Sequence, residues 1–325
     1  MVVLVAVFSP NAAWTLPRAA FEALARQFPQ HEFLDAWTED DVERLLPRAD
    51  VAFTAYLNRG QVGSLTRLRW VQSPAAGVGH LLSTELGTSD IVLTSARGVR
   101  AHAIAEHILA VTLMLARQLH AALRRQLARE WDPDVLEARI VTLSGRRMTI
   151  VGFGAIGQEL ARIAAPIGLR ISAVRRRPEL GAPDYVEEAV APETLDALLP
   201  RTDVLVLAAP LTPDTKFLIG EPALNRIRKG ALLVNVGRGK LIDDGAVVAA
   251  LNDGRLGGAA LDVFTKEPLS EDSPYWTLPN VIVTPHTSGA MEDYWTPLLA
   301  LFAENLRRFE AGQPLLNVVD KTAGY

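Results

Sequence analysis

Three observations predict that this chain folds as two doubly wound α/β domains, each built on a parallel sheet. Strand-like and helix-like segments alternate along the whole sequence, which is typical of parallel sheets flanked by helices. A glycine-rich hexapeptide at Gly152–Gly157 follows an apolar run and precedes a helix-forming stretch. The length of 325 residues favours two domains over one.

The first part of the chain is predicted to form a compact α/β unit that ends near Ser95. A helix is expected near Leu16–Gln27. The strand candidates are Val2–Val7, Val51–Thr54, Leu68–Gln72 and Ile91–Thr94. The apolar N-terminal run has no basic segment and no small-residue cleavage site, so we expect a buried first strand rather than a signal peptide.

One long helix is predicted from about His102 to Arg129, because this stretch contains neither proline nor glycine. Its first half is apolar on several faces, and its second half is rich in arginine. A helix of this kind lies deep in a core or is covered by a partner subunit. We therefore expect the helix near 102–129 to form the surface of a homodimer.

A second α/β unit is predicted to begin with the strand Met148–Val151. Five further strand candidates follow at Ile171–Val174, Val204–Ala208, Ala231–Val234, Gly258–Leu261 and Val281–Val283. The last helix, about Tyr294–Ala311, lies beyond the sixth of these strands. We expect it to pack on the first unit, which would make that unit discontinuous in sequence.

The composition excludes several classes of protein. Lysine and arginine number 33 and aspartate and glutamate 37, so the net charge is −4, whereas nucleic-acid binders usually have a basic surplus. There is no cysteine, and therefore no disulfide, thiolate metal site or cysteine nucleophile. The longest later apolar stretch, Ala103–Ala116, is too short to span a bilayer. We expect a cytoplasmic protein that binds neither nucleic acid nor membrane.

The hexapeptide matches the dinucleotide-binding pattern GxGxxG in its strand–turn–helix context. Gly152 permits a tight turn, Gly154 allows close approach of a pyrophosphate, and Gly157 allows the helix to pack on the strand. The N–H groups around Ala155 and Ile156 would bind the anion. A glycine-rich turn without a ligand is the alternative interpretation.

Arginines follow the second strand of this unit, where an NAD enzyme places an acidic residue for the ribose 2′-hydroxyl. The chain has Arg175, Arg176 and Arg177 there, and the nearest following acid is Glu179. Guanidinium groups bind a 2′-phosphate through charge-assisted hydrogen bonds, which a carboxylate would repel. We predict NADP(H) as the preferred cofactor, with NAD(H) possible; a solvated basic turn is the alternative.

Three polar residues, Arg238, Glu267 and His286, each follow a strand-like apolar run, where open α/β sheets place their chemistry. Reduction of a 2-keto acid needs a hydride at C2 and a proton on the carbonyl oxygen. His286 is a suitable proton donor, and Glu267 could fix its tautomer. Arg238 could hold the substrate carboxylate and polarise the carbonyl.

Four segments resemble the signature segments of the D-isomer-specific 2-hydroxyacid dehydrogenases: Pro210–Thr215, Asn235–Gly239, Asp262–Pro268 and Thr284–His286. The resemblance covers nearly the whole chain and is strongest from Ser144 to Gly289. With its arginine turn, the chain is most similar to the NADP-linked glyoxylate and hydroxypyruvate reductases. The family also implies a homodimer.

The resemblance implies a flavodoxin-like substrate domain (1–98 and 290–325) and an inserted Rossmann domain that binds NAD(P) (99–289), with the active site in the cleft between them. It implies that Val78, Gly79, Arg238 and His286 bind the substrate, although the chain has His80 where the family more often has an acid. It also implies a cofactor site, and the full set of expected cofactor contacts is Gly152, Gly154, Ala155, Ile156, Gly157, Arg175, Arg176, Arg177, Pro210, Thr215, Val236, Gly237, Arg238, Asp262 and His286.

The remaining histidines and aromatics have simpler explanations. His102 and His107 are expected to be packed beside the long helix, and no histidine spacing suggests a metal site. Tyr56, Trp131 and Trp295 could border the substrate pocket, but aromatic residues more often lie in a core.

The leading hypothesis is NADPH-dependent reduction of a small 2-keto acid of the glyoxylate or hydroxypyruvate type to the D-2-hydroxy acid. One alternative is NAD(P)-dependent oxidation of a D-2-hydroxy acid such as D-3-phosphoglycerate. That reaction would need Arg59, Arg97 or Arg100 at the phosphate. The other alternative is a non-catalytic protein that senses dinucleotides, because fold alone does not prove catalysis.

Overall fold

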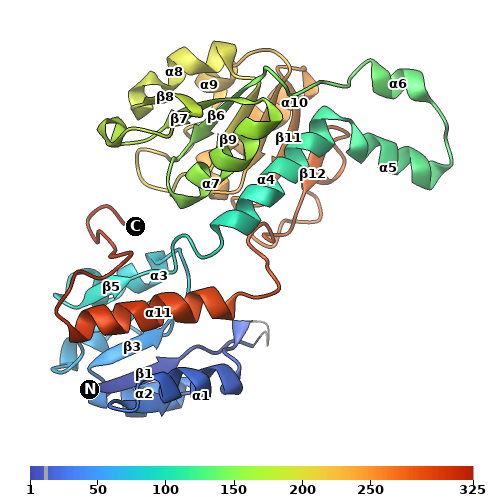
Figure 1. Cartoon of the computed structure of the whole chain (residues 1–325). Coiled ribbons are helices and arrows are strands. Elements are labelled where there is room, and N and C mark those ends of the chain that lie inside the picture. Colours follow the sequence, from blue (N-terminus) through green and yellow to red (C-terminus); the bar gives the residue numbers. More distant parts are fainter. Residues whose placement is uncertain (11–13, 325) are drawn as a thin grey trace. The chain divides into compact units, whose positions relative to one another are not determined.

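The computed structural model describes residues 1–10 and 14–324 and divides into two compact units (Figure 1). Unit 1 comprises Met1–Val99 and Met291–Tyr325, and unit 2 comprises Arg100–Ala290. Each unit has one fully parallel sheet with helices on both faces, so the predicted fold class is confirmed. In the described part of the chain, no helix combines the length and the apolar character needed to cross a membrane.

The sheet of unit 1 has five strands in the order β2-β1-β3-β4-β5, the flavodoxin-like order. Its strands are β1 (Val2–Ala6), β2 (Glu32–Asp35), β3 (Val51–Thr54), β4 (Trp70–Gln72) and β5 (Val92–Thr94). Strand β2 was not predicted, because this short edge strand has no buried residue and no strong apolar pattern.

Two helical layers cover the sheet of unit 1. On one face lie α1 (Arg18–Gln27) and α11 (Trp295–Glu310), and on the other lie α2 (Glu39–Leu45) and α3 (Gly79–Leu82). Phe302 of α11 stacks on Phe53 at a centroid distance of 4.6 Å and on Trp70 at 5.4 Å. The burial of these rings holds the C-terminal helix in the core of unit 1.

The sheet of unit 2 has seven strands in the order β12-β11-β10-β9-β6-β7-β8, which is the doubly wound Rossmann order with one further strand. The strands are β6 (Arg147–Val151), β7 (Arg170–Val174), β8 (Val186–Val190), β9 (Val204–Leu207), β10 (Ala231–Asn235), β11 (Leu256–Leu261) and β12 (Val281–Val283). The edge strand β8 was not predicted, because its apolar run is interrupted by Glu187 and Glu188. The strand order reverses between β6 and β9, and this is the point where such sheets bind ligands.

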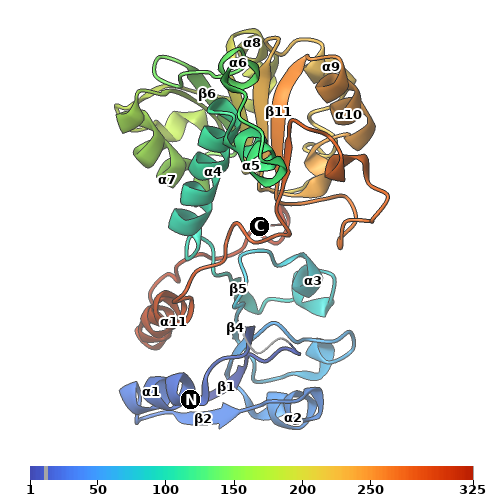
Figure 2. The ribbon, with the colours of Figure 1, turned by 90° about the vertical axis from the view of Figure 1, so that its right-hand side faces the viewer.

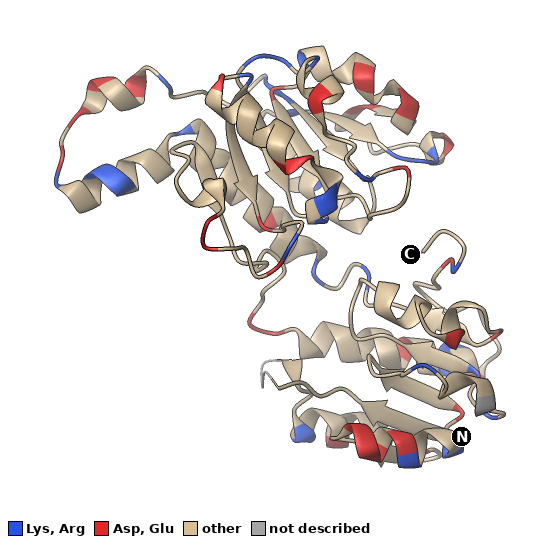
Figure 3. Ribbon diagram, turned by 180° about the vertical axis from the view of Figure 1, so that it is seen from behind, with Lys and Arg blue, Asp and Glu red and all other residues tan. Residues whose placement is uncertain are grey.

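Figure 2 shows the helices on the two faces of the sheet in unit 2. On one face α4 (Ala101–Ala116) packs against α7 (Ala155–Ala164) and contacts β10 and β11. On the other face lie α8 (Leu195–Leu198), α9 (Glu221–Leu224) and α10 (Asp244–Asn252). Lysine and arginine are interspersed with aspartate and glutamate on the face that Figure 3 shows.

The prediction of one long helix from His102 to Arg129 is wrong. The helix ends at Ala116, and α5 (Leu119–Ala128) begins after Gln118, which has a left-handed φ of 56°. The Gln118 side chain caps the end of α4 by donating to Leu115 O at 2.9 Å. Propensity favours continuation here, but the left-handed conformation of Gln118 ends α4, and α5 then runs in another direction towards α6 (Pro133–Glu137) (Figure 1).

Candidate active site

The glycine turn lies at the strand-order reversal, between the ends of β6 and β9. Gly152 has a φ of +98°, and a Cβ there would lie 2.5 Å from Ala209 N. A Cβ on Gly157 would overlap Gly152 O, whereas a Cβ on Gly154 would have nothing within 4 Å. Gly152 and Gly157 are therefore required for packing, and Gly154 faces open space.

The start of α7 can bind an anion. Its first helical hydrogen bond runs from Gln158 N to Gly154 O at 2.9 Å. The N–H groups of Ala155, Ile156 and Gly157 therefore have no acceptor within the helix, and the helix dipole favours negative charge at this end. The open space at Gly154 and these N–H groups fit the pyrophosphate of a dinucleotide.

The three arginines follow β7 on the same edge of the sheet. The guanidinium of Arg175 lies 5.9 Å from the ring centroid of Phe153 and donates to Gly181 O at 3.0 Å. Arg175 is half-buried, whereas Arg176 and Arg177 are exposed. Arg175 thus connects the glycine turn to the loop after β7, and the other two arginines border solvent.

The ends of β9 and β10 complete this edge of the sheet. Thr215 Oγ1 donates to Pro210 O at 2.7 Å and closes the loop after β9. Val236 is buried, and Gly237 N donates to Asn235 Oδ1 at 3.1 Å. A Cβ on Gly237 would lie 2.8 Å from Ala209 O, so these two loops are in close contact.

Arg238 begins a tight turn that is held from two sides. Asn235 Nδ2 donates to Arg238 O at 3.1 Å, and the Arg238 guanidinium donates to Gly237 O at 2.7 Å. A Cβ on Gly239 would overlap the backbone of Phe264. The turn therefore packs directly against the chain that follows β11 and leads to Glu267.

Glu267 and His286 form a hydrogen-bonded pair. Nδ1 of His286 lies 2.7 Å from Glu267 Oε2, and Glu267 Oε1 accepts from Phe264 N at 2.9 Å. The His286 side chain is 54% exposed, so its other ring nitrogen remains accessible. Partial burial raises the pKa of Glu267, but the hydrogen bonds from His286 and Phe264 N and the charges of His286 and Arg238 outweigh it and hold the pKa below its usual range.

Asp262 holds the segment 284–288, which contains His286. The buried Asp262 carboxylate accepts from Thr284 Oγ1 at 2.6 Å, Thr287 N at 2.9 Å and Ser288 N at 3.0 Å. His286 N donates to Asp262 O at 2.9 Å. Burial raises the pKa of Asp262, but these hydrogen bonds outweigh it and keep the pKa below its usual range.

Asn235 and Thr284 lie in the signature segments, but the sequence indicated no role for either of them in this site. Asn235 is a polar residue at the end of the buried strand β10, and such a residue could have been singled out because a buried amide needs partners. Thr284 directly follows β12, and its hydroxyl contacts Asp262. Both hold loops rather than extend into solvent.

The remaining candidate residues for the substrate pocket lie in unit 1, apart from Trp131. Val78 and Gly79 lie in unit 1 at the start of α3, where Val78 is buried and a Cβ on Gly79 would meet open space. Tyr56 stacks on Phe8, Trp295 lies beside Tyr294, and Trp131 is exposed.

The expectation for the two histidines near α4 is half right. His107 is half-buried. The prediction that His102 is packed is wrong, because its ring is exposed and pairs with Glu159 at 2.6 Å and Glu106 at 3.2 Å.

The Gly239 contact predicts that a single methyl group disrupts this site. Gly239→Ala should lower the free energy of unfolding by about 1–3 kcal/mol, because the Phe264 backbone must move. Gly245→Ala, in α10, is the matched control and should be neutral or stabilising, since its Cβ meets only Asp243 Oδ1 at 3.4 Å. Urea unfolding measures both, and equal stability of the two variants would contradict the prediction.

Comparison with known proteins identifies the family. Residues 109–288 match the family model for the NAD-binding domain of the D-isomer-specific 2-hydroxyacid dehydrogenases. The chain is 34% identical over 324 residues to the glyoxylate reductase of Aeropyrum pernix, covering 93% of this chain and 92% of that protein. It is 28% identical over 317 residues to the glycerate dehydrogenase of Methylorubrum extorquens, covering 94% and 98%.

A solved structure agrees with this match over the whole chain. It is the NADPH-dependent glyoxylate/hydroxypyruvate reductase from Sinorhizobium meliloti in complex with NADP and sulfate, 29% identical, with a TM-score of 0.83 and coverage of 100% of both chains. The resemblance seen in the sequence is confirmed. The chain belongs to the D-isomer-specific 2-hydroxyacid dehydrogenases and is an NAD(P)-dependent oxidoreductase.

Proposed function

We propose that this protein catalyses the NADPH-dependent reduction of a small 2-keto acid, of the glyoxylate or hydroxypyruvate type, to the D-2-hydroxy acid. The observation that carries the proposal is the Glu267–His286 pair, 2.7 Å apart, beside the Arg238 turn at the carboxyl edge of a Rossmann sheet. The names of the A. pernix and S. meliloti relatives support this substrate class.

The bound cofactor supplies a hydride to C2 of the keto acid. The Arg238 guanidinium binds the substrate carboxylate and polarises the carbonyl group. His286 Nε2 donates a proton to the carbonyl oxygen, which becomes the hydroxyl group of the product. Glu267 accepts the Nδ1–H of His286, keeps the ring oriented and stabilises the imidazolium that donates the proton.

The arginine turn supports a preference for NADPH. Three guanidinium groups follow β7, and the 2′-phosphate of NADPH carries the charge that they would bind. We assign Arg176 and Arg177 to the phosphate, because Arg175 is half-buried over Phe153 and donates to Gly181 O. NADH lacks this phosphate and would bind more weakly.

We propose that unit 1 is the substrate domain and unit 2 the cofactor domain. The backbone N–H groups of Val78 and Gly79, at the start of α3, are the groups of unit 1 that we assign to substrate binding. The open space at Gly79 gives a carboxylate room to approach the backbone there.

Loss of NADPH or NADH absorbance with glyoxylate, hydroxypyruvate, pyruvate, phenylpyruvate and 3-phosphohydroxypyruvate tests the function. We expect turnover with the small acids and a higher kcat/KM for NADPH. A preference for the phosphorylated acid would favour the phosphoglycerate reaction instead. Tight NADPH binding without any turnover would favour a dinucleotide-sensing role.

Arg177→Ala isolates the role of the phosphate contact. The variant should raise the KM for NADPH roughly tenfold, because it loses a charge-assisted hydrogen bond, and leave the KM for NADH unchanged. Arg201→Ala removes an exposed guanidinium from the same unit and is the control. An equal effect on both cofactors would contradict the assignment.

Glu267→Gln should change the pH dependence of reduction. Because the pKa of Glu267 lies below its usual range, its carboxylate is charged at neutral pH, and the variant removes this charge from beside the imidazolium. The acid limb of kcat against pH that protonation of Glu267 causes should therefore be absent in the variant, and kcat at neutral pH should fall roughly tenfold because the ring loses its charged partner. Glu271→Gln, an exposed acid in the same loop, should leave the profile unchanged.

We also propose that the protein is a homodimer, through an arm formed by residues 119–137. The arm contains α5, α6 and the loop between them, and it extends from the body of unit 2 (Figure 1). Leu119, Leu123 and Leu127 recur every four residues along one side of α5 and are exposed, Leu127 at 85%. Trp131, next along the arm, is 96% exposed. Apolar side chains in such a row are typical of an interface.

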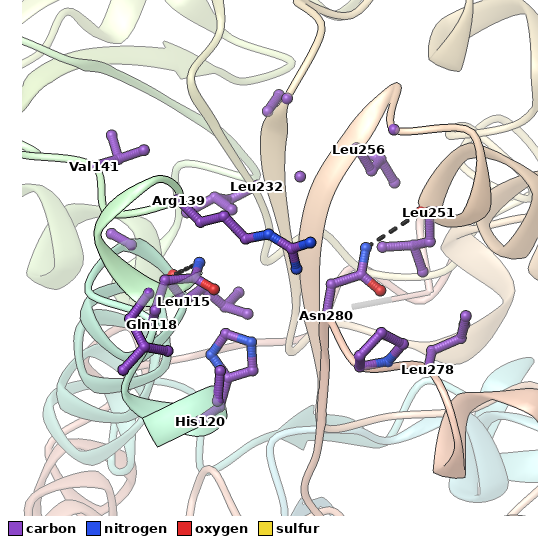
Figure 4. A pocket seen from close by; sticks show the side chains of 18 of the residues that line it. Leu115, Gln118, His120, Arg139, Val141, Leu232, Leu251, Leu256, Leu278 and Asn280 are labelled. Carbon is purple, nitrogen blue, oxygen red and sulfur yellow. Dashed lines mark hydrogen bonds between the residues drawn. The ribbon is translucent and has the colours of Figure 1, made fainter. Parts of the chain in front are cut away.

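A pocket of about 960 Å³ lies beside this arm, within unit 2 (Figure 4). It is lined by Leu115 and His120 from the helices and by Leu232, Leu256 and Asn280 from the sheet. These sheet residues lie at or near the amino ends of their strands, so the pocket is at the edge opposite to the glycine turn. We propose that the partner's arm occupies it.

Light scattering should give twice the mass of one chain. Leu127→Asp combined with Trp131→Asp should give a monomer, because the charges cannot be buried in an interface. Ile167→Asp, an exposed apolar position elsewhere in unit 2, is the control and should leave the mass unchanged. A monomeric wild-type protein would contradict the proposal.

A further inference from the structure

A histidine on α4 touches the hydrogen-bond network that holds His286. Nε2 of His107 lies 3.4 Å from Thr284 Oγ1. Thr284 Oγ1 in turn lies 2.6 Å from Asp262 Oδ1. A continuous path of hydrogen bonds therefore leads from the middle of α4 to the carboxylate around which the segment 284–288 is folded.

The hydrogen atoms of this path can have only one arrangement. The hydroxyl of Thr284 has a single hydrogen, which it donates to the Asp262 carboxylate. Its oxygen therefore presents a lone pair to His107, so Nε2 of His107 must be the donor. Burial lowers the pKa of His107, although the charge of Asp262 opposes this, so the ring is neutral at neutral pH. Nε2–H is then its single N–H group.

The segment that this path supports is under backbone strain. His286 has a φ of 54°, in the left-handed region that costs a residue with a side chain about 1–2 kcal/mol. Such a conformation persists when its surroundings fix it. His286 N bonds to Asp262 O, and Thr287 N and Ser288 N bond to the Asp262 carboxylate, so the direction of this carboxylate decides where His286 lies.

We propose that His107 is a positioning residue for His286, acting through Thr284 and Asp262. The donor on α4 fixes the rotamer of the Thr284 hydroxyl, and that hydroxyl fixes the Asp262 carboxylate. The effect on turnover rests on the proposed function, in which His286 gives up the proton. A displacement of about 1 Å at such a group is enough to slow a reaction about 100-fold.

Three substitutions of His107 separate positioning from packing. Glutamine places its amide nitrogen near the position of Nε2, whereas asparagine has the same amide but ends near Nδ1. Phenylalanine keeps the ring volume and has no donor. We expect His107→Gln to retain kcat within about threefold, and His107→Asn and His107→Phe to lose roughly 10- to 100-fold in kcat with little change in the KM for NADPH.

A double-mutant cycle tests the route of the effect. Thr284→Val removes the hydroxyl, and in this background His107→Phe should have no further effect on kcat. Additive losses would overturn the proposal, because His107 would then act by another path. Equal kcat in the glutamine, asparagine and phenylalanine variants would also overturn it. So would an equal loss in all three with a lowered Tm, which indicates packing alone.

Hydrogen exchange gives a readout that does not depend on turnover. In the full-length protein, His107→Phe should speed exchange in the peptide that spans 284–288, and His107→Gln should not. Unchanged exchange in the phenylalanine variant would overturn the proposal. If the wild-type protein turns over no keto acid, the proposed function fails, and this exchange comparison still decides the role of His107.

Discussion

The buried carboxylate of Asp262 is the group on which the geometry of the candidate active site depends. It accepts hydrogen bonds from Thr284 Oγ1, Thr287 N and Ser288 N, which lie on both sides of His286. A buried charge without such donors would be unstable, so the carboxylate requires the N–H and O–H groups of the segment 284–288. The segment in turn keeps its conformation because the carboxylate accepts these hydrogen bonds. The left-handed conformation of His286 is maintained by this mutual constraint, and that conformation places the ring against Glu267.

A second constraint comes from the positions at which a side chain cannot fit. Gly152 packs against Ala209, Gly237 against Ala209 O, and Gly239 against the Phe264 backbone. These contacts bring the loops after β6, β9, β10 and β11 to van der Waals distance of one another at a single edge of the sheet. Gly154 differs from these three glycines, because a Cβ there would have no atom of the protein within 4 Å. The absence of a side chain at Gly154 therefore leaves space for a ligand and is not required by a contact with another loop.

Local patterns made much of this predictable from the sequence. The glycine turn and the ends of the central strands could be placed because apolar runs and punctuating residues are adjacent in the chain. The edge strands β2 and β8 were missed, since half-exposed strands lack such runs. The role of Thr284 depends on its contact with Asp262, which lies 22 positions earlier in the chain, and no local pattern encodes such a contact. The contacts of Asn235 with Gly237 and Arg238, and of Gln118 with Leu115, are local, but they are turn and capping contacts that apolar periodicity does not reveal.

The distribution of charge at this edge explains how two carboxylates can lie in a site that we propose to bind anions. Three hydrogen-bond donors stabilise the negative charge of Asp262, and His286 and Phe264 N stabilise that of Glu267. Arg238, by contrast, donates to the neutral backbone carbonyl of Gly237, so this hydrogen bond does not neutralise its positive charge, which the proposed function assigns to the substrate carboxylate. Because both acids have a lowered pKa, this balance holds across the neutral range, and protonation in acid would first remove the support of His286 rather than the charge of Arg238.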